Sequence, residues 1–459
     1  MGSKWKKTSL QDLGVKLIDC DHKTPKAVEE GVPYIGIPQM DNGRINFDAN
    51  PRLISEEDFI KWTRKANPQY GDVILSRRCN SGETVYVPKN SKFALGQNLV
   101  LLRPEGDRLH PEYFRWAVHG REWWSEVAKY LNPGAIFESL KCADIPKFEI
   151  PEPPKDVQIK IAKVLTNISD KIELNQKLNQ TLEQMAQALF KSWFVDFDPV
   201  IDNALAAGSD IPEALQHKAE QRRQAQKLPD FKPLPDNIRA LFPSEFEQTD
   251  EPIIGIAGWI PEGWKPTSIH DMVDTISDTY KLKEVDEVIF LNTGDIEDGK
   301  FLHKDYSPTV GLPGQAKKSI AKGDILYSEI RPKNKRYAFV DFDAKEYVVS
   351  TKLMVLRAKE NINPLLPYFI LTQDKTVNEL QHVAEHRSGT FPQITFKELA
   401  KVLAVFPQGP ELIDLFVEQY LTPLFTKKLA SIEQNEQLEK LRDTLLPKLI
   451  SGEVPLKSE

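Results

Sequence analysis

Cysteine is scarce in this chain, and long hydrophobic runs are absent. The 459 residues include three cysteines, Cys20, Cys79 and Cys142, which is an odd number spread far apart. This usage argues against a disulfide framework or a cysteine-ligated zinc site and is typical of a reducing cytoplasm. No stretch of 18 or more apolar residues occurs, so no segment is expected to span a membrane. We therefore expect a cytoplasmic protein without a membrane partner.

Recognisable catalytic motifs are also missing. The sequence has no GxxxxGK[ST] phosphate loop and no GxGxxG dinucleotide loop; residues 311–319 have the wrong spacing, with Pro313 among them. His382 and His386 lie one helical turn apart, but no third ligand accompanies them, so no metal site is expected. We expect a non-catalytic recognition or scaffolding protein that holds no cofactor. An enzyme with an unrecognised site is a weaker alternative.

What the sequence does contain is an internal repeat. The opening KWKKTSLQDL returns as WKPTSIHDM at residues 264–272. Five further pairs keep the same order: Val32–Phe47 with Val288–Leu302, Gly71–Arg78 with Gly323–Arg331, Leu99–Val118 with Leu353–Leu371, Gly134–Pro151 with Gly389–Pro407, and Ile172–Leu178 with Ile432–Leu438. Any two α/β domains could share Gly-Asp turns, but not the whole ordered series. The sequence therefore predicts an internal duplication.

A long helix is predicted after each globule. Residues 156–194 contain neither proline nor glycine, and apolar residues recur there at alternating spacings of four and three, as in a coiled-coil seam. The second helix is placed at residues 411–451, where Pro423 and Pro447 predict an irregular start and an irregular end. We predict that the two helices pair antiparallel. The alternative is that each helix packs only on its own globule.

The seam positions follow from this spacing. Those predicted to pair are Ile161, Leu165, Ile168, Ile172, Asn175, Leu182 and Leu189 in the first helix, and Leu424, Ile432, Asn435, Leu438, Leu445 and Leu449 in the second. Asn175 and Asn435 occupy equivalent places, and a buried Asn in a seam fixes the register at a cost in stability. Two exposed asparagines on a solvated face are the alternative.

The chain thus divides into five segments. They are a first globule (1–154), a first helix (155–195), a connector (196–262), a second globule (263–410) and the second helix (411–451). The predicted fold class is mixed α/β, with two globules joined by an antiparallel coiled coil in an internal pseudo-two-fold repeat. Residues 195–262 hold 13 acidic and 6 basic residues, which accounts for the whole formal net charge of −7. The globules therefore remain free to present basic faces.

Basic and amide residues follow the Gly-Asp strand in both copies. They are Arg77, Arg78 and Asn80 in the first copy, and Arg331, Lys333, Asn334, Lys335 and Arg336 in the second. Arginine and lysine neutralise phosphates, while arginine can contact guanine and asparagine can contact adenine in a bidentate manner. Taken alone, either loop could be an ordinary solvated turn. Their equivalent positions favour contact with double-stranded DNA.

The order of globule, long helix, connector, globule and long helix resembles the specificity subunit of type I restriction–modification systems. The stretches that carry the resemblance are FEIPEPPKDVQIKIAKVL at the first globule–helix junction, QALFKSWFVDFDP at the end of the first helix, GWIPEGWK before the second copy, and LRDTLLPKLISGEV near the C-terminus. The sequence departs from the family where Val157 and Gln158 replace the usual Glu-Gln pair. The second junction, FPQGPELIDLF, departs as well.

The resemblance implies that each globule is a target-recognition domain that reads one half of a split DNA sequence. The helices would set the gap between the halves and dock modification (methyltransferase) subunits, two in number, and restriction/translocase subunits would complete the complex. It further implies that S-adenosylmethionine, ATP and Mg²⁺ serve the partner subunits. The competing interpretation is a coiled-coil scaffold that does not recognise a DNA sequence.

Overall fold

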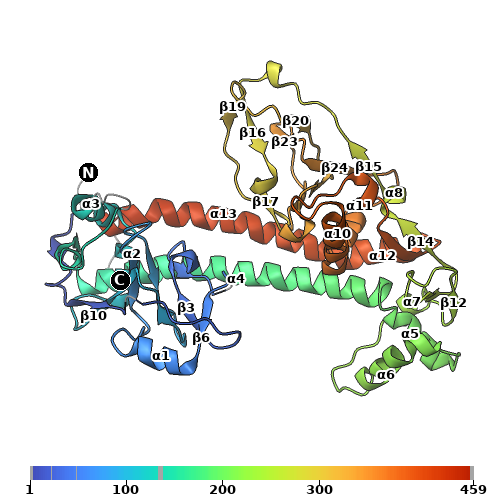
Figure 1. Cartoon of the computed structure of the whole chain (residues 1–459), viewed down its shortest axis with the longest axis horizontal. Helices are drawn as coiled ribbons and strands as arrows, with labels where there is room; N and C mark the ends of the chain where they lie inside the picture. Colours follow the sequence, from blue (N-terminus) through green and yellow to red (C-terminus); the bar gives the residue numbers. More distant parts are fainter. Residues whose placement is uncertain (1–3, 22, 48, 133–137, 455–459) are drawn as a thin grey trace. The chain divides into compact units, whose positions relative to one another are not determined.

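The chain folds into two compact units in the computed structural model, which describes residues 4–21, 23–47, 49–132 and 138–454. Unit 1 comprises residues 1–177 with 431–459, and unit 2 comprises residues 178–430. Figure 1 labels the two longest helices, α4 (Lys155–Phe194) and α13 (Thr422–Ser451), each of which contributes residues to both units. Residues 134–137, with which one of the repeated stretches begins, lie outside the described residues.

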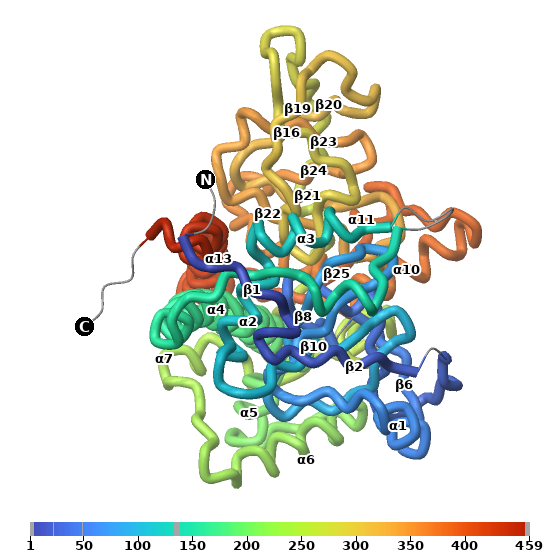
Figure 2. Tube along the Cα trace, turned by 90° about the vertical axis from the view of Figure 1, so that its left-hand side faces the viewer, coloured from blue at the N-terminus to red at the C-terminus, as the bar shows by residue number. Residues whose placement is uncertain are grey.

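The two largest sheets of the globule of unit 1 contain most of its strands. Their strands are β2 (Val15–Asp19), β3 (Val32–Ile35), β6 (Arg52–Ile54), β7 (Val73–Ser76), β8 (Thr84–Tyr86), β9 (Ala94–Leu95) and β10 (Leu99–Pro104). One sheet has the order β2-β10-β7-β8 with antiparallel neighbours, and the other has the order β6-β3-β9, in which β3 and β9 are parallel. Figure 2 shows β2, β8 and β10 grouped in the blue part of the tube.

The alternation of side chains along β10 divides the core of unit 1. Val100 and Leu102 belong to a cluster with Tyr113 and Trp123, which come from the helices that follow the sheet. Leu101 points to the opposite face and belongs to a second cluster, because successive residues of a strand face opposite sides. The remaining elements are β1 (Lys7–Ser9), β4 (Met40–Asp41), β5 (Arg44–Ile45), α1 (Glu56–Thr63), α2 (Pro111–Ala117), α3 (Arg121–Tyr130) and β11 (Glu149–Pro151).

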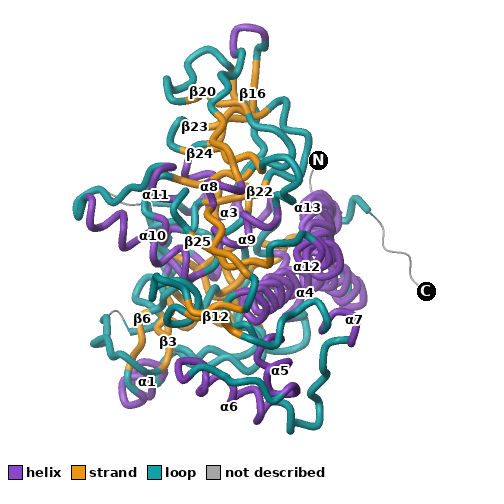
Figure 3. The backbone as a smooth tube through the Cα atoms, turned by 90° about the vertical axis from the view of Figure 1, so that its right-hand side faces the viewer, coloured by secondary structure: helices purple, strands orange, loops and turns teal. Residues whose placement is uncertain are grey.

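The globule of unit 2 repeats this arrangement. Its strands and helices are β14 (Trp264–Ser268), β15 (Val273–Ile276), β16 (Glu287–Leu291), β17 (Ile296–Glu297), β18 (Lys300–Phe301), β19 (Ser307–Pro308), β20 (Ala316–Ser319), β21 (Ile325–Ser328), β22 (Tyr337–Phe339), β23 (Tyr347–Ser350), β24 (Leu353–Ala358), α9 (Leu365–Thr372), α10 (Asp374–Arg387) and β25 (Leu403–Pro407). The sheet β15-β24-β21-β22 has the connectivity of β2-β10-β7-β8. In the second sheet, β16 and β23 are parallel, as β3 and β9 are, and β20 is added. Figure 3 shows β16, β20 and β23 grouped together in orange.

The first repeated stretch forms the same turn in both units. Ser9 Oγ donates to Asp12 Oδ2 over 2.6 Å and accepts from the Asp12 N–H over 3.3 Å. Ser268 and Asp271 form the same two bonds, over 2.6 and 3.3 Å. The second of these bonds satisfies the aspartate N–H, a backbone donor that the short turn leaves open. The two α/β globules and the internal repeat predicted from the sequence are therefore confirmed.

The Gly-Asp turn also forms the same ion pair, in which the aspartate is buried, in both units. Asp72 accepts from Arg103 Nε over 2.8 Å and from Nη2 over 2.7 Å. Asp324 accepts from Arg357 in the same way, over 2.7 and 2.9 Å. Both aspartates are fully buried, so the guanidinium compensates a charge that water does not reach. The aspartate of the repeated Gly-Asp motif therefore serves the fold.

The two long helices run antiparallel within unit 1. Near the start of α4, Ile161 and Leu165 share a core cluster with Leu449 at the end of α13. Further along α4, Asn175 is hydrogen-bonded to Asn435, which lies earlier in α13. Rising residue numbers in one helix therefore meet falling numbers in the other.

The same direction holds for the helical residues of unit 2. Glu183 on α4 accepts a hydrogen bond from Lys428 on α13 over 2.6 Å. Phe190 lies one to two turns further along α4 and has its ring centroid 6.2 Å from that of Phe416, which precedes α13. The predicted antiparallel pairing is thus present in both units.

The second long helix is irregular at its start. Helix α12 (Glu411–Phe416) leads into a π-helical turn (Val417–Leu421) before α13 begins, with Pro423 in its first turn. The irregular end predicted at Pro447 is not observed, because α13 continues to Ser451. Leu449 and Ile450 are buried in the core of unit 1, and this burial holds the last turn despite the missing proline N–H.

The connector contains more helix than the sequence suggested. The sequence predicts one short helix-like run there, Pro212–Lys227, and α6 (Gln216–Ala225) falls within it. Helices α5 (Asp198–Ala207) and α7 (Asp236–Arg239) were not predicted. A β-hairpin of β12 (Phe246–Gln248) and β13 (Trp259–Pro261) follows in the connector. The globule of unit 2 also contains the short helices α8 (Ile269–Met272) and α11 (Phe396–Leu399). Within the described ranges, every helix is too short or too polar to cross a membrane.

Candidate nucleic-acid interface

The basic loop of unit 1 connects β7 to β8. Cys79 and Asn80 adopt left-handed backbone conformations with φ of 52° and 65°, which turn the chain sharply. Arg78 and Asn80 are exposed. Arg77 is different: its side chain is 11% exposed, and its Nη2 lies 4.0 Å from Asp19 Oδ1. Arg78 and Asn80 are therefore presented to solvent, whereas Arg77 faces the interior of the globule.

The basic loop of unit 2 connects β21 to β22 and contains a short 3-10 turn. Arg331 and Lys335 flank this turn with φ of 44° and 52°. The Lys333 N–H donates to Gln381 Oε1 over 3.1 Å, which ties the loop to α10. The side chains of Arg331, Lys333 and Asn334 are all exposed. This loop therefore presents two cations and an amide from an anchored backbone.

The last two basic residues of this loop have partners within unit 2. Lys335 Nζ donates to Asp374 Oδ1 over 2.9 Å, and this bond raises the pKa of the lysine. Arg336 Nη1 donates to the Ile296 carbonyl over 3.0 Å and lies 3.7 Å from Glu297 Oε1. Both side chains hold the loop against its neighbours, a role that the sequence analysis did not foresee.

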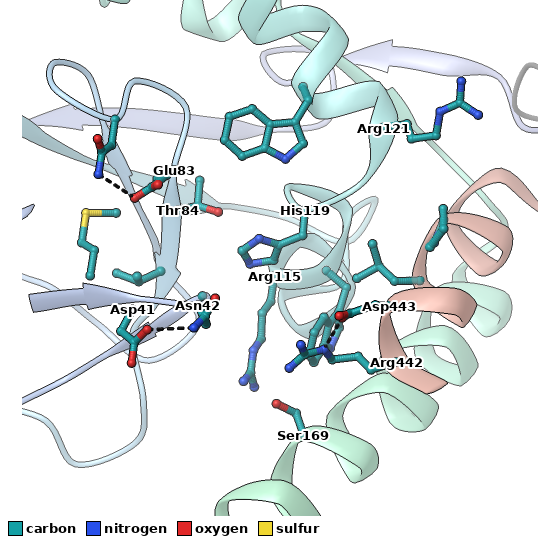
Figure 4. A pocket seen from close by; sticks show the side chains of 18 of the residues that line it. Asp41, Asn42, Glu83, Thr84, Arg115, His119, Arg121, Ser169, Arg442 and Asp443 are labelled. Atoms are coloured by element: carbon teal, nitrogen blue, oxygen red, sulfur yellow. Dashed lines mark hydrogen bonds and ion pairs between the residues drawn. The ribbon is translucent and has the colours of Figure 1, made fainter. Parts of the chain in front are cut away.

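A hollow of about 980 Å³ lies in unit 1 between the β4–β5 turn, the β7–β8 loop and the helices. It brings the predicted Asn80 together with residues that the sequence analysis missed, among them Asp41, Asn42, Glu83, Thr84, Arg115, His119, Arg121, Trp124, Ser169 and Arg442. Figure 4 shows Asn42, Glu83 and Thr84 facing His119, with Ser169 and Arg442 on the helices beyond. These residues are far apart in the sequence, so no local motif announces the hollow.

The tight β4–β5 turn shapes one wall of the hollow. Asn42 and Gly43 have φ of 45° and 79°, as a two-residue hairpin turn requires. A Cβ at residue 43 would lie 2.8 Å from His119 Nε2, so glycine is also needed for the close approach to α2 and α3. Arg44 then reaches α4, where its Nη2 donates to Ser169 Oγ over 2.8 Å and its Nη1 forms an ion pair with Glu173.

Positive charge gathers around His119. Burial, and to a lesser extent the guanidinium groups of Arg115 and Arg442, lower the pKa of His119 to about 4. The Arg115 guanidinium stacks 4.8 Å from the Tyr86 ring centroid, which fixes its position. The imidazole is therefore neutral near pH 7 and able to accept or donate a hydrogen bond.

The predicted seam residues fall into two groups by burial. Ile161, Leu165, Ile172, Asn175, Leu182, Asn435 and Leu449 are buried, and Ile168, Leu189, Leu424, Ile432, Leu438 and Leu445 are partly buried. Phe190, Phe425, Lys428 and Ser431 are buried helix residues that the prediction did not include. Phe190 and Phe425 directly follow predicted positions, as expected when a straight helix drifts from a strict seven-residue repeat.

The described ranges do not meet the requirements of a metal site. They contain no group of three or more His, Cys, Asp and Glu side chains arranged to hold a metal ion. His382 Nδ1 lies 3.8 Å from Glu385 Oε2 on the exposed side of α10.

Comparison with known families gives one match that covers both globules. The model of the type I restriction modification DNA specificity domain matches residues 2–184 and 261–410. The two matched ranges contain the two repeated globules, and most of the connector lies outside them.

Individual relatives agree with this match. The specificity subunit of the type I restriction enzyme HindI of Haemophilus influenzae is 43% identical over 188 residues, which span 40% of this chain and 39% of that protein. The MjaIX specificity subunit of Methanocaldococcus jannaschii is 23% identical over 92% of this chain and 87% of its own length. The crystal structure of a type I restriction–modification S subunit from M. genitalium superposes with a TM-score of 0.54 at 14% identity, covering 99% of this chain and 97% of that one, and so shares the fold.

Proposed function

The chain belongs to the type I restriction modification DNA specificity family, and from this premise we propose that it is the DNA-reading subunit of a type I restriction–modification complex. Each globule reads one half of a bipartite target in double-stranded DNA. The observation that carries the proposal is that one DNA-specificity model matches the chain twice, once on each copy of the repeated globule. A pseudo-repeated reader suits two half-sites that are separated along the duplex.

In this proposal α4 and α13 set the gap between the half-sites and dock two modification subunits. The buried hydrogen bond between Asn175 and Asn435 supports a fixed register, because sliding one helix would leave both amides without partners. A four-residue insertion near residue 175, matched by one near residue 435, should lengthen both helices by about 6 Å. The gap between half-sites should then widen by one or two base pairs, whereas an unchanged gap would mean that the helices do not set it.

The chain itself catalyses nothing in this scheme and acts in the cytoplasm, where the DNA is. Adenine methylation with S-adenosylmethionine belongs to the modification subunits. ATP-driven translocation and cleavage with Mg²⁺ belong to the restriction/translocase subunits. Incubation of this chain alone with methyl donor and DNA should give no methyl transfer, and transfer by the isolated chain would overturn this division of labour.

The experiment that tests the DNA-reading role is a genome-wide map of adenine methylation, by single-molecule sequencing, with and without this gene. Deletion should remove methylation from one split motif, two short sequences around a fixed run of unspecified bases. Re-expression of the intact chain should restore the same motif. If no motif changed and the reconstituted complex also bound all sequences equally, the proposal would fail.

A coiled-coil scaffold without DNA sequence recognition is the competing function. Gel shifts with the assembled complex separate the two, because a reader retains its preference for the split motif when competitor DNA and salt are raised. A scaffold would show only binding that salt removes, with no preference at low salt.

A further inference from the structure

The repeat allows the two globules to be compared position by position, with the backbone as a guide. The Ser76 N–H donates to the Glu83 carbonyl over 2.9 Å, and the Ser328 N–H donates to the Arg336 carbonyl over 2.8 Å. Because both bonds close the loop after the same strand, Glu83 and Arg336 occupy equivalent positions. One unit therefore has a carboxylate where the other has a guanidinium.

Two further positions next to this loop differ in the same manner. Asn42 and Asp298 begin equivalent hairpin turns, with φ of 45° and 47°, and each is followed by a glycine at φ 79°. Arg121 and Asp374 are the first residues of the equivalent helices α3 and α10. An amide is thus exchanged for a carboxylate, and a cation for an anion, while the backbone is retained.

A fourth position beside the loop differs in the length of its side chain. Thr84 pairs with Leu75, and Tyr337 pairs with Tyr327, at the same place in the β7–β8 and β21–β22 hairpins. Tyr337 reaches the neighbouring turn, where its hydroxyl donates to Asp298 Oδ1 over 2.9 Å. Thr84 is too short to do this.

The Thr84 hydroxyl is left without a partner. Its Oγ1 is buried and has no hydrogen-bond partner within the described part of the chain, and the residue lines the hollow of unit 1. A buried polar atom without a partner costs stability, and this cost disappears when a ligand supplies the missing hydrogen bond.

The charged side chains also differ between the units in whether they have a partner. In unit 2, Asp374 accepts a hydrogen bond from Lys335. Arg336 donates to the Ile296 carbonyl and forms an ion pair with Glu297. In unit 1, Arg121 is exposed and forms no ion pair with any described residue, and Glu83 has one weak contact, 3.4 Å from Asn80 Nδ2. Asn42 Nδ2 donates to the neighbouring Asp41 Oδ1 over 2.9 Å at the exposed hairpin turn, so its amide oxygen, Glu83 and Arg121 are the groups that a ligand can use. Their counterparts in unit 2, Asp298 among them, are mostly satisfied internally.

The positions that differ are distinct from those that stabilise the fold. The Asp72–Arg103 pair, the paired Ser76 and the glycine after Asn42 are kept in both units. Side chains that line the hollow are exchanged for ones of opposite or different chemistry. The fold therefore does not depend on which side chains stand at these positions. Different side chains are expected there if the two units bind different half-sites.

From this we infer that the hollow of unit 1 is a base-reading surface for one half of the DNA target, with Asn42, Glu83 and Arg121 as specificity-determining side chains. The inference rests on the proposed function and deepens it. Base edges present both donors and acceptors, so a reader needs amide, carboxylate and guanidinium groups together. A site for phosphate alone would be poorly served by Asp41 and Glu83 on its wall. Asp443, which also lines the hollow, accepts from Arg442 Nε over 2.9 Å, so Arg115 and Arg121 are the cations that offset Asp41 and Glu83.

The test uses the intact chain assembled with its modification and restriction subunits, and a library of DNA targets in which every half-site position is varied. The variants are Asn42→Ala, Glu83→Gln, Arg121→Lys and Thr84→Tyr. Arg121→Lys keeps the charge and removes the two-point geometry. Thr84→Tyr introduces the residue that stands at this position in unit 2. Arg64→Gln, an exposed arginine of unit 1 that does not line the hollow, is the matched control.

We expect each of the first three variants to relax discrimination by about 5-fold to 150-fold at one base position of one half-site, as for a lost side chain–base contact. The other half-site and assembly with partners should stay unchanged, as should Arg64→Gln. Thr84→Tyr should weaken recognition of the same half-site, and circular dichroism should show that the variants remain folded.

Three results would overturn the inference while leaving the proposed function intact. They are an unchanged target with unchanged affinity, an equal loss of affinity for all sequences with a smaller salt dependence, and a loss of assembly with a partner subunit. The second would make the hollow a phosphate contact, and the third would make it a protein-docking surface. If the unaltered complex preferred no split target at all, the proposed function itself would be at fault.

Discussion

The side chains of Asn175 and Asn435 are hydrogen-bonded to each other although 260 residues separate them, with Asn175 Nδ2 donating to Asn435 Oδ1 over 2.9 Å. Asn175 Nδ2 also lies 2.8 Å from Gln434 Oε1, and Asn435 Nδ2 donates to the Ile172 carbonyl over 3.3 Å. Both asparagines are buried, so the alternative of two solvated side chains does not describe them. The two equivalent residues of the repeat thus pair with one another.

Replacing one member of this pair should be more harmful than replacing both. Asn175→Leu leaves the buried Asn435 Oδ1 without its donor, although Asn435 Nδ2 keeps its bond to the Ile172 carbonyl, and should lower the free energy of unfolding by about 1–3 kcal/mol. Asn175→Leu with Asn435→Leu should recover much of this loss, because two apolar side chains then fill the seam. Urea unfolding of the two single variants and the double variant gives the coupling energy.

Leu174 supplies the matched control for this cycle. It lies on the same turn of α4 but is 60% exposed, so Leu174→Ala should change stability by less than about 0.5 kcal/mol. Additive effects of the two asparagine substitutions would show that the hydrogen bond does not couple the helices.

The repeated ion pairs should stabilise each globule separately. Asp72→Ala leaves the Arg103 guanidinium without its buried carboxylate and should destabilise unit 1 by about 3 kcal/mol. Asp324→Ala should destabilise unit 2 by about 2 kcal/mol, because water reaches the 41% exposed Arg357 side chain and replaces part of the lost interaction. Limited proteolysis in increasing urea, followed by mass spectrometry, reports which globule opens first.

An exposed ion pair of unit 2 provides the comparison. Lys345 has an 86% exposed side chain 2.9 Å from Asp343, and Lys345→Ala should change stability by at most about 1 kcal/mol. Similar losses for Asp324→Ala and Lys345→Ala would contradict the role assigned to burial.

Stability should fall as the pH falls from about 6.5 to about 4, in part because of His119. Its pKa is lowered in the folded state from an ordinary value of 6.5 to about 4, so within this window the unfolded chain binds a proton that the folded chain does not. Acid therefore favours unfolding. The stability from this group is fully present above pH 6.5.

His119→Gln removes this titrating group and should flatten the dependence of the free energy of unfolding on pH between 6.5 and 4.5. Urea unfolding at a series of pH values measures the slope, and an NMR titration of the imidazole measures the pKa directly. Equal slopes for the two proteins would show that His119 titrates at its ordinary value when folded.

The basic loop of unit 2 should divide into residues that bind and residues that support. Arg331→Ala with Lys333→Ala removes two exposed cations, and DNA affinity should drop for all sequences with a salt dependence reduced by about one or two charges. Arg336→Ala instead removes the bond to the Ile296 carbonyl and should lower stability by about 1 kcal/mol.

Binding titrations at several salt concentrations, paired with urea unfolding, separate these effects. The assignment would be reversed if Arg336→Ala changed only DNA binding and the Arg331 and Lys333 double variant changed only stability.

Much of the architecture could be predicted from sequence because it depends on local patterns. The proline- and glycine-free run after residue 155 specifies a helix, and each Gly-Asp motif specifies a turn before a buried strand. The internal repeat then predicts that each turn, strand and helix of the first globule has a counterpart in the second. Asn175 and Asn435 could be aligned on this basis before their contact was known.

Tertiary structure alone decided which side chains are free to bind. Arg77 and Arg78 are neighbours in the sequence, yet Asp19 faces the first while the second is exposed. Likewise, Lys333 is exposed, but Arg336 is held by Ile296, a residue 40 positions earlier. Only folding brings such distant partners within hydrogen-bonding distance, and no local pattern records them.

The hollow of unit 1 likewise could not be predicted from local sequence patterns. Asn42, Thr84 and Arg442 have no periodicity in common, and they meet because a hairpin turn, a strand and a long helix converge. The sequence by itself determined the repeat, the helices and the positions of the basic loops, because these follow from spacing along one chain. Packing alone decided how far each side chain reaches: Tyr337 in unit 2 bonds to Asp298 on the neighbouring turn, whereas the shorter Thr84 in unit 1 leaves its buried hydroxyl without a partner in the described part of the chain.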